Sequence, residues 1–312
     1  MKKEFYDPES FHSFFAADVR NHSIVLFDPA MSESKSFADL DFCIAWEWNA
    51  DDDPNCKIKP GAGIDAAKLR YSPYYGKDVL LVTSSVGWAG VVDYEARSLI
   101  WEWSYKGGNF HDIEMMPNGD VVVAGSRGNG QIFYIPLSAG MTTPSSQLSA
   151  PSGHGAMYDP QNDWLWYLNF NEIFAVRVEN AGTTNATISR VAEKTVTFPE
   201  GEADGHALSP VLGEPGKYAV SNSSAAYVFD SKTMTLTRLP DPYNGENIKG
   251  MAFFADQTAA IMIADEGSYF SHIIRIVRIL RQQDGAAELK THDCKIIARM
   301  FYKVFPATKN YQ

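Results

Sequence analysis

The sequence has few cysteines, no long apolar segment and no surplus of positive charge. Its three cysteines are an odd number without CxxC spacing, which indicates neither a disulfide framework nor a thiolate zinc site and predicts reduced, mostly structural thiols. No run of about 18 apolar residues is present to span a membrane as a helix. Residues 1–8 lack the apolar core of a signal peptide, so we expect a cytoplasmic protein, although a chain whose export signal had been removed would look the same.

The 38 acidic residues outnumber the 27 basic ones and give a formal charge of -11. Binding to nucleic acid or to an anionic membrane depends on lysine and arginine neutralising phosphates, so the composition argues against both partners. An oligosaccharide or another small acidic ligand held in a local basic pocket remains compatible with it.

Helical periodicity is scarce as well. The apolar runs are short, alternate at period two, are rich in Val, Ile, Tyr, Phe and Trp, and are separated by Gly, Pro, Asn and Asp. This pattern is typical of an all-β chain.

One phrase recurs along the chain. Residues 111–125 read His-Asp-Ile-Glu-Met-Met-Pro-Asn-Gly-Asp-Val-Val-Val-Ala-Gly, which predicts a hairpin with a Pro-Asn-Gly turn. The phrase returns in altered form from His154, His206 and Lys249, and with a longer turn from Asp65. The copies are spaced by roughly 40 to 50 residues, the length of a four-stranded propeller blade.

Each unit also has an apolar third strand, and these strands lie at residues 23–27, 90–94, 131–135, 172–176, 226–229 and 273–277. We therefore predict a six-bladed β-propeller of four-stranded antiparallel blades that occupies residues 1–312 as a single domain. The first blade lacks an innermost strand of its own. The C-terminal segment 295–305 is predicted to supply it, so that the N- and C-terminal segments together close the ring.

The first strands of propeller blades line the central channel, so the residues that open them meet near the axis. The sequence predicts a ring of three imidazoles, an amine and a carboxylate at one channel mouth, formed by His111, His154, His206, Lys249 and Asp65. Two residues further on the side chains are apolar, which predicts a plugged channel; they are Ile113, Ala156, Leu208 and Met251.

Two kinds of chemistry fit this ring. The three imidazoles, with Asp65 as a further ligand, are suited to hold a divalent metal (Mn, Zn or Ca) and leave positions for water and substrate. Without a metal, the histidines serve as general acid and base, and Lys249 stabilises developing negative charge. The competing interpretation is that the histidines only hydrogen-bond loop carbonyls at the rim of the ring.

Two candidates for substrate binding are outside the histidine register. Lys68, in the copy that follows Asp65, is predicted either to reach an acidic ligand or to be a solvated surface lysine. Trp88 is flanked by Gly87 and Gly90, which predicts either an exposed ring that stacks on a sugar or ordinary blade packing.

Polar residues beside the histidines are interpreted as supporting groups. Asn109 and Asp204 each precede a histidine by two residues and are predicted to orient the imidazoles, and Asn109 is also a candidate substrate ligand. Asp112 and Glu114 point to the other face of their strand, which favours packing between blades or turn capping over catalysis.

Three phrases together resemble an uncharacterised family of bacterial six-bladed propellers. They are Gly108-Asn-Phe-His-Asp-Ile-Glu with Pro117-Asn-Gly, His154-Gly-Ala-Met-Tyr-Asp-Pro, and Gly205-His-Ala-Leu-Ser-Pro. The resemblance spans most of the chain and implies the fold, whereas the family itself has no assigned activity.

Two further propeller families are more distantly similar. His-Asp followed by Pro-Asn-Gly is similar to the arylsulfotransferases, whose channel histidines act on sulfate esters, but this sequence shows no matching channel arginine. Oligogalacturonate lyases hold a divalent metal with channel histidines and cleave uronate oligosaccharides by β-elimination. Their ligand motif is absent from this sequence, so that parallel is architectural.

These observations predict a carbohydrate-active enzyme, a lyase or glycoside hydrolase, that acts on an acidic, uronate-type oligosaccharide. His111, His154, His206 and Lys249 are its predicted catalytic residues. The alternative is a non-catalytic propeller that binds a glycan or a protein partner and whose histidines are structural.

Overall fold

The computed structural model describes residues 4–6, 12–28, 43–58, 62–126, 130–282 and 287–310. These residues are mostly in β-strands and the turns between them, and the 3₁₀ helix η4 (Leu137–Ala139) is a short exception. The prediction of an all-β chain is therefore confirmed.

Four-stranded antiparallel sheets make up most of the molecule. Four of them stand alone, and within each the strands pair in the following order. They are β25 (Phe301–Pro306), β2 (Phe14–Asp18), β3 (Ser23–Phe27) and β4 (Ile44–Asn49); β5 (Ala66–Ser72), β6 (Lys77–Ser84), β7 (Trp88–Asp93) and β8 (Ser98–Ser104); β9 (Phe110–Met115), β10 (Val121–Gly125), β11 (Gln131–Ile135) and β12 (Ser146–Ser149); and β13 (Gly155–Asp159), β14 (Trp164–Leu168), β15 (Glu172–Glu179) and β16 (Thr187–Thr197).

The remaining strands form one nine-stranded sheet that contains two antiparallel runs. The runs are β17 (Ala207–Leu212), β18 (Lys217–Ser221), β19 (Ala226–Asp230) and β20 (Thr235–Arg238), and β21 (Ile248–Phe254), β22 (Ala259–Ile263), β23 (Ile273–Gln282) and β24 (Ala287–Lys295). A short parallel pairing of Val211 with Phe253 and of Leu212 with Phe254 joins them. The strand β1 (Glu4–Tyr6) pairs with β23.

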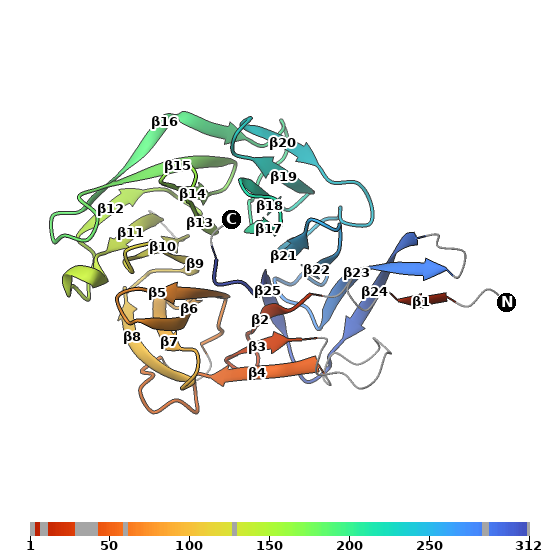
Figure 1. Cartoon of the computed structure of the whole chain (residues 1–312), viewed down its shortest axis with the longest axis horizontal. Coiled ribbons are helices and arrows are strands. Elements are labelled where there is room, and N and C mark those ends of the chain that lie inside the picture. Colours follow the sequence, from red (N-terminus) through yellow and green to blue (C-terminus); the bar gives the residue numbers. More distant parts are fainter. Residues whose placement is uncertain are drawn as a thin grey trace.

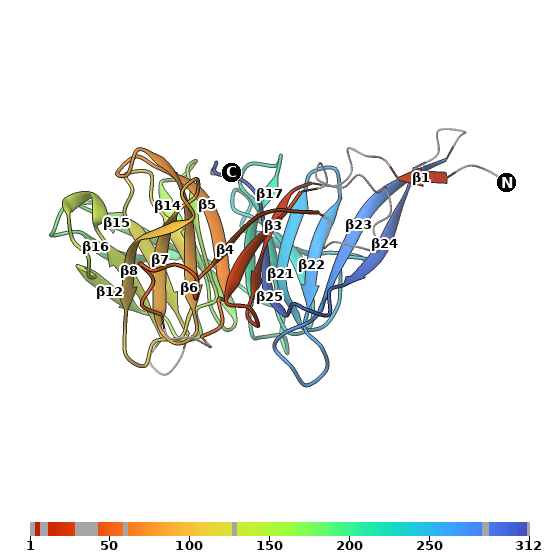
Figure 2. The ribbon, with the colours of Figure 1, turned by 90° about the horizontal axis from the view of Figure 1, so that it is seen from below.

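The sheets are arranged around a common centre, and β5, β9, β13, β17, β21 and β25 are the strands nearest to it (Figure 1). Each of these inner strands contacts the next one around the circle. Seen from the side, the strands stand across the thin dimension of the molecule (Figure 2). This arrangement is propeller-like, and it brings the starts of several inner strands to one place.

The circle is closed by strands from the two ends of the described chain. The late strand β25 pairs antiparallel with the early strand β2, with Phe305 opposite Phe15 and Val304 opposite Ala16. The prediction that the C-terminal segment completes the first sheet is therefore confirmed. Because Phe15 and Val304 are almost fully buried, the pairing also encloses apolar surface that would otherwise face water.

The recurrent phrase at residues 111–125 forms the predicted hairpin of β9 and β10. In its turn, the amide of Gly119 donates to the carbonyl of Met116, and Gly119 has a φ of 91°. A Cβ atom at this position would lie 2.7 Å from Cβ of Tyr74 in the neighbouring sheet. Glycine is therefore required both by the left-handed backbone and by the close contact between sheets.

Of the two interpretations of Trp88, an exposed ring that stacks on a sugar and ordinary packing between strands, the structure shows packing. The side chain is 2% exposed, and its Nε1 donates to Glu102 at 2.9 Å. A Cβ atom on Gly90 would lie 2.5 Å from the Trp88 ring. Gly90 therefore makes room for a buried indole, and the expectation that the Trp88 ring is exposed is wrong.

Candidate functional site

Three histidines from three consecutive inner strands lie against one another near the centre of the ring. His111 is on β9, and His154 and His206 directly precede β13 and β17. The rings of His111 and His154 are stacked with centroids 4.5 Å apart, and the ring of His206 meets that of His154 edge-on at 5.1 Å. The structure thus brings together the histidines that the repeat places in register. We refer to them, with Asp65 and Lys249, as the histidine cluster.

One end of the cluster combines a carboxylate with an amine. His206 Nε2 lies 3.0 Å from Oδ2 of Asp204 and 2.5 Å from Nζ of Lys249, which is on β21. Ser223 Oγ donates to the same Asp204 oxygen at 2.6 Å. The hydrogen bond to His206 holds the pKa of Asp204 well below its usual range, whereas burial lowers the pKa of His206 and of Lys249.

The other end of the cluster combines an amide with a protonated acid. Asn109 Nδ2 donates to His111 Nε2 at 2.8 Å, and His111 Nδ1 lies 3.7 Å from Oδ2 of Asp65. Burial raises the pKa of Asp65 to about 8, although a hydrogen bond from Ser85 acts in the opposite direction. Asp65 therefore keeps its proton at neutral pH.

His154, in the middle of the row, is held as a neutral imidazole. Its Nδ1 donates to the carbonyl oxygen of Ser152 at 3.0 Å. Burial, with smaller contributions from the neighbouring His206 and Lys303, lowers its pKa to about 3. A group with this pKa accepts hydrogen bonds at neutral pH, but it is a weak proton acceptor compared with a general base whose pKa is near the working pH.

Lys303, which the repeat does not include, contacts the cluster through the backbone. It lies on the closing strand β25, and its Nζ donates to the backbone oxygens of His111 at 2.9 Å and of His154 at 2.5 Å. Burial lowers its pKa to about 8. The preceding residue, Tyr302, places its ring 5.5 Å from that of His111. The signal that points to Lys303 is a lysine in the middle of the apolar run Phe-Tyr-Lys-Val-Phe of a predicted innermost strand.

Lys68 belongs to the interior of the ring. Its side chain is fully buried, and its Nζ bonds Oδ2 of Asp112 at 2.8 Å and the carbonyl oxygen of Ala156 at 2.5 Å. Next to it, Arg70 and Glu114 form a fully buried bidentate pair at 2.7 and 2.8 Å. The expectation that Asp112 and Glu114 contact a neighbouring sheet is confirmed. The interpretation of Lys68 as a solvated surface lysine is wrong, because its side chain is buried and its ammonium is paired with Asp112, and a contact with an acidic ligand stays a prediction.

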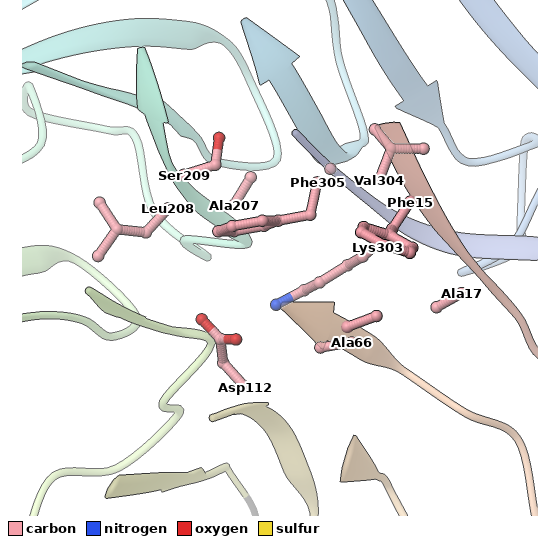
Figure 3. Close-up of a pocket in the computed structure, with 12 residues that line it drawn as sticks. Phe15, Ala17, Ala66, Asp112, Ala207, Leu208, Ser209, Lys303, Val304 and Phe305 are labelled. Atoms are coloured by element: carbon pink, nitrogen blue, oxygen red, sulfur yellow. The ribbon is translucent and has the colours of Figure 1, made fainter. Parts of the chain in front are cut away.

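The centre of the ring is filled. A cavity of about 10 Å³ remains between β5, β9, β17 and β25, and Lys303 extends across it toward Asp112 (Figure 3). This volume holds about one water molecule. The four predicted plug residues Ile113, Ala156, Leu208 and Met251 are buried as expected, but charged side chains fill part of the same space.

The predicted metal ligands do not form a ready coordination site. Within the described residues, no group of three or more His, Cys, Asp or Glu side chains is placed to hold a metal ion. The Nε2 atoms of His111 and His206 face Asn109 and Lys249, and the first two imidazoles are stacked instead of converging on one point. A divalent metal at the cluster therefore remains a prediction.

A family model described as a family of unknown function (DUF6528) matches residues 46–286. The chain belongs to the DUF6528 family. The match includes all five residues of the histidine cluster and ends before β25, which carries Lys303. A comparison with curated proteins finds no match.

Two of the solved structures that are similar to this DUF6528 chain have low sequence identity to it. A protein of unknown function from Bacteroides caccae has a TM-score of 0.49 and 12% identity over 95% of this chain and 98% of that chain. BBS1N, in a complex with ARL6DN soaked with lead, has a TM-score of 0.47 and 10% identity over 80% and 71% of the two chains.

None of the helices in the described part of the chain has the length and apolar character needed to cross a membrane.

Proposed function

We propose that this DUF6528 chain is a carbohydrate-active enzyme, a lyase that acts on an acidic, uronate-type oligosaccharide at the histidine cluster. In this proposal the ring has six blades, and the nine-stranded sheet contributes two of them, β17–β20 and β21–β24.

The observation that carries the proposal is the contact among Asp204, His206 and Lys249. The Nε2 atom of His206 lies between a carboxylate, which accepts hydrogen bonds, and an amine, which donates them, at 3.0 and 2.5 Å. Burial lowers the pKa of His206, so its imidazole is neutral and able to accept a proton at neutral pH. When Nε2–H donates to Asp204, that hydrogen bond orients the ring, and the lone pair of Nδ1 is the one able to accept a proton as a general base.

The charges around the cluster favour an acidic ligand. Lys249 and Lys303 contribute two ammonium groups, and Asp204 contributes one carboxylate. Asp65 is neutral at neutral pH because burial raises its pKa to about 8. The local excess of positive charge lies in a chain whose overall charge is -11, which supports a specific anion site.

In a β-elimination, each of these groups has a separate role. His206 takes the C5 proton next to the uronate carboxylate, and Lys249 neutralises that carboxylate as negative charge builds on it. The electron pair of the C5–H bond becomes the C4=C5 double bond while the C4–O bond breaks. The departing C4 oxygen takes up a proton from water, because Asp65 lies at the other end of the cluster beside His111.

A screen of galacturonate, mannuronate and glucuronate oligosaccharides for the ultraviolet absorbance of a new C=C bond tests the proposal. We expect turnover by the wild type and a loss of at least about 100-fold in His206→Gln and Lys249→Met. His22→Gln is the matched control, because His22 pairs with Asp51 outside the cluster. No absorbance with any of the three classes contradicts the lyase.

A second candidate, a non-catalytic binding protein with structural histidines, is favoured by burial. His111, His154 and His206 are only 9%, 8% and 3% exposed. Metal analysis of the purified protein and binding assays with His154→Ala and His206→Ala separate the two. Absence of a bound divalent metal together with unchanged binding or activity in both variants favours the structural role.

A further inference from the structure

Two exposed aromatic residues lie beside the charged end of the histidine cluster, Tyr269 through its ring and Phe170 through its backbone. Tyr269, in the β22–β23 connection, is 67% exposed, and its ring centroid lies 5.4 Å from Nζ of Lys249. Phe170, in the β14–β15 turn, is 48% exposed. Its carbonyl oxygen accepts hydrogen bonds from the amides of Asp204 and Gly205, which directly precede His206.

The two aromatic residues occupy the same place in two different sheets, the connection between the second and third strands. The Tyr269 ring is next to Lys249 and the backbone of Phe170 is next to Asp204, so each aromatic residue lies beside one of the two residues that contact His206. Single exposed apolar side chains are common on protein surfaces. Two exposed aromatic residues beside the same buried acid–base group point instead to a shared role in binding.

We propose that Tyr269 and Phe170 are stacking platforms for the sugar rings on either side of the uronate bound at Lys249, so that the site takes an unbranched acidic oligosaccharide of at least three rings. This inference rests on the proposed function and adds the length of the substrate to it. The apolar C–H face of a pyranose packs against an aromatic face and leaves its hydroxyl groups in water, which suits half-exposed rings better than fully buried ones.

The arrangement also divides the binding energy between two kinds of contact. The carboxylate of the central sugar pairs with Lys249, while the neighbouring sugars contribute through apolar stacking. A monosaccharide gains only the first contact, and a trimer gains both. The proposal therefore predicts that affinity rises with chain length and that the rise depends on the two aromatic rings.

Calorimetric titration with galacturonic and mannuronic acid and with their trimers tests this prediction. The proteins are the wild type, Tyr269→Ala, Phe170→Ala and the double variant, each also made in a His206→Gln background if the trimer is cleaved. Tyr74→Ala is the matched control, because Tyr74 is 45% exposed in the turn between β5 and β6.

We expect each single variant to weaken trimer binding about three- to tenfold, the range of one aromatic contact, and to leave monomer binding unchanged. Trimer binding that is equal in wild type and variants overturns the stacking platforms and leaves the proposed function standing. A wild type that binds neither trimer overturns the inference, and one that also fails to bind the glucuronic acid trimer overturns the proposed function as well. A trimer affinity lost equally in Tyr74→Ala also overturns the inference, since the loss is then not specific to the two platforms.

Discussion

Nζ of Lys303, on the last strand, donates a 2.9 Å hydrogen bond to the backbone oxygen of His111 on β9. The same ammonium bonds the backbone oxygen of His154. The strand that closes the ring therefore also fixes two neighbouring inner strands at the point where their histidines begin. The same strand thus completes the ring of sheets and helps to hold the histidine cluster in place.

Lys303→Met should raise the pKa of His154 above its value of about 3. Burial is the main cause of that low pKa, and the nearby ammonium adds to it, so only part of the depression is relieved. Histidine ring signals followed by NMR against pH measure the change. Lys57→Met is the control, because the Lys57 side chain is 86% exposed and pairs with Glu102 outside the cluster. An unchanged His154 titration contradicts the electrostatic link.

Asp65→Asn should stabilise the protein increasingly as the pH rises. The pKa of Asp65 is about 8 in the folded protein and near 4 in the unfolded chain, so the folded state binds the extra proton between these values. The contribution of Asp65 to stability is therefore present below about pH 4 and is lost as the pH rises through about 8. Urea denaturation should show a small difference at pH 4 and a gain of at least about 1 kcal/mol for the variant at pH 8. A difference that does not change with pH refutes the raised pKa.

Glu114→Ala should destabilise the fold by about 3–5 kcal/mol, because it leaves the fully buried Arg70 without its carboxylate. The double variant Arg70→Leu with Glu114→Leu should recover most of the loss, since no unpaired charge remains. Urea denaturation measures both. Glu288→Ala removes one partner of a pair whose side chains are 44% and 54% exposed, and should change stability by less than about 0.5 kcal/mol. A small effect of Glu114→Ala would mean that water reaches Arg70.

A chain that stops after Ala298 should lose cooperative unfolding and aggregate. It lacks β25, so the edge of β2 has no partner and the buried contacts of Phe301 are missing. Analytical ultracentrifugation and thermal unfolding monitor the effect. A peptide of residues 299–310 added during refolding should restore the monomer, and a scrambled peptide should not. A truncated chain that unfolds with the wild-type midpoint refutes the closing role.

The sheets could be predicted because their signals are local. A Pro-Asn-Gly turn sets the hairpin of β9 and β10, and the position of His111 relative to that turn recurs at His154 and His206. Equivalent positions in a closed ring converge, so the contact among the three histidines follows from the register. The partner Asn109 also follows, because it lies two residues before His111 on the same chain segment.

The errors concern contacts between segments far apart in the sequence. Alternation along β5 predicts which face of the strand carries Lys68. It does not predict that a carboxylate on β9, that of Asp112, lies close enough to pair with it. The glycines around Trp88 look the same whether they expose a ring or accommodate one, and only the position of the indole over Gly90 decides. The contacts of Lys303 could not be predicted for the same reason, because its partners His111 and His154 are far from it in the sequence.

The pairing of β2 with β25 also means that two strands of one sheet are synthesised far apart in time. Asp18 and Arg299, which pair at the seam, are 281 positions apart. At roughly 5–20 residues per second, a ribosome needs about 15 to 60 s to make the chain between them, and during that time β2 waits with an open edge. Until β25 leaves the ribosome, the edge of β2 is open to pairing with other chains. We therefore expect the yield in cells to depend on chaperones as well as on the stability of the folded protein.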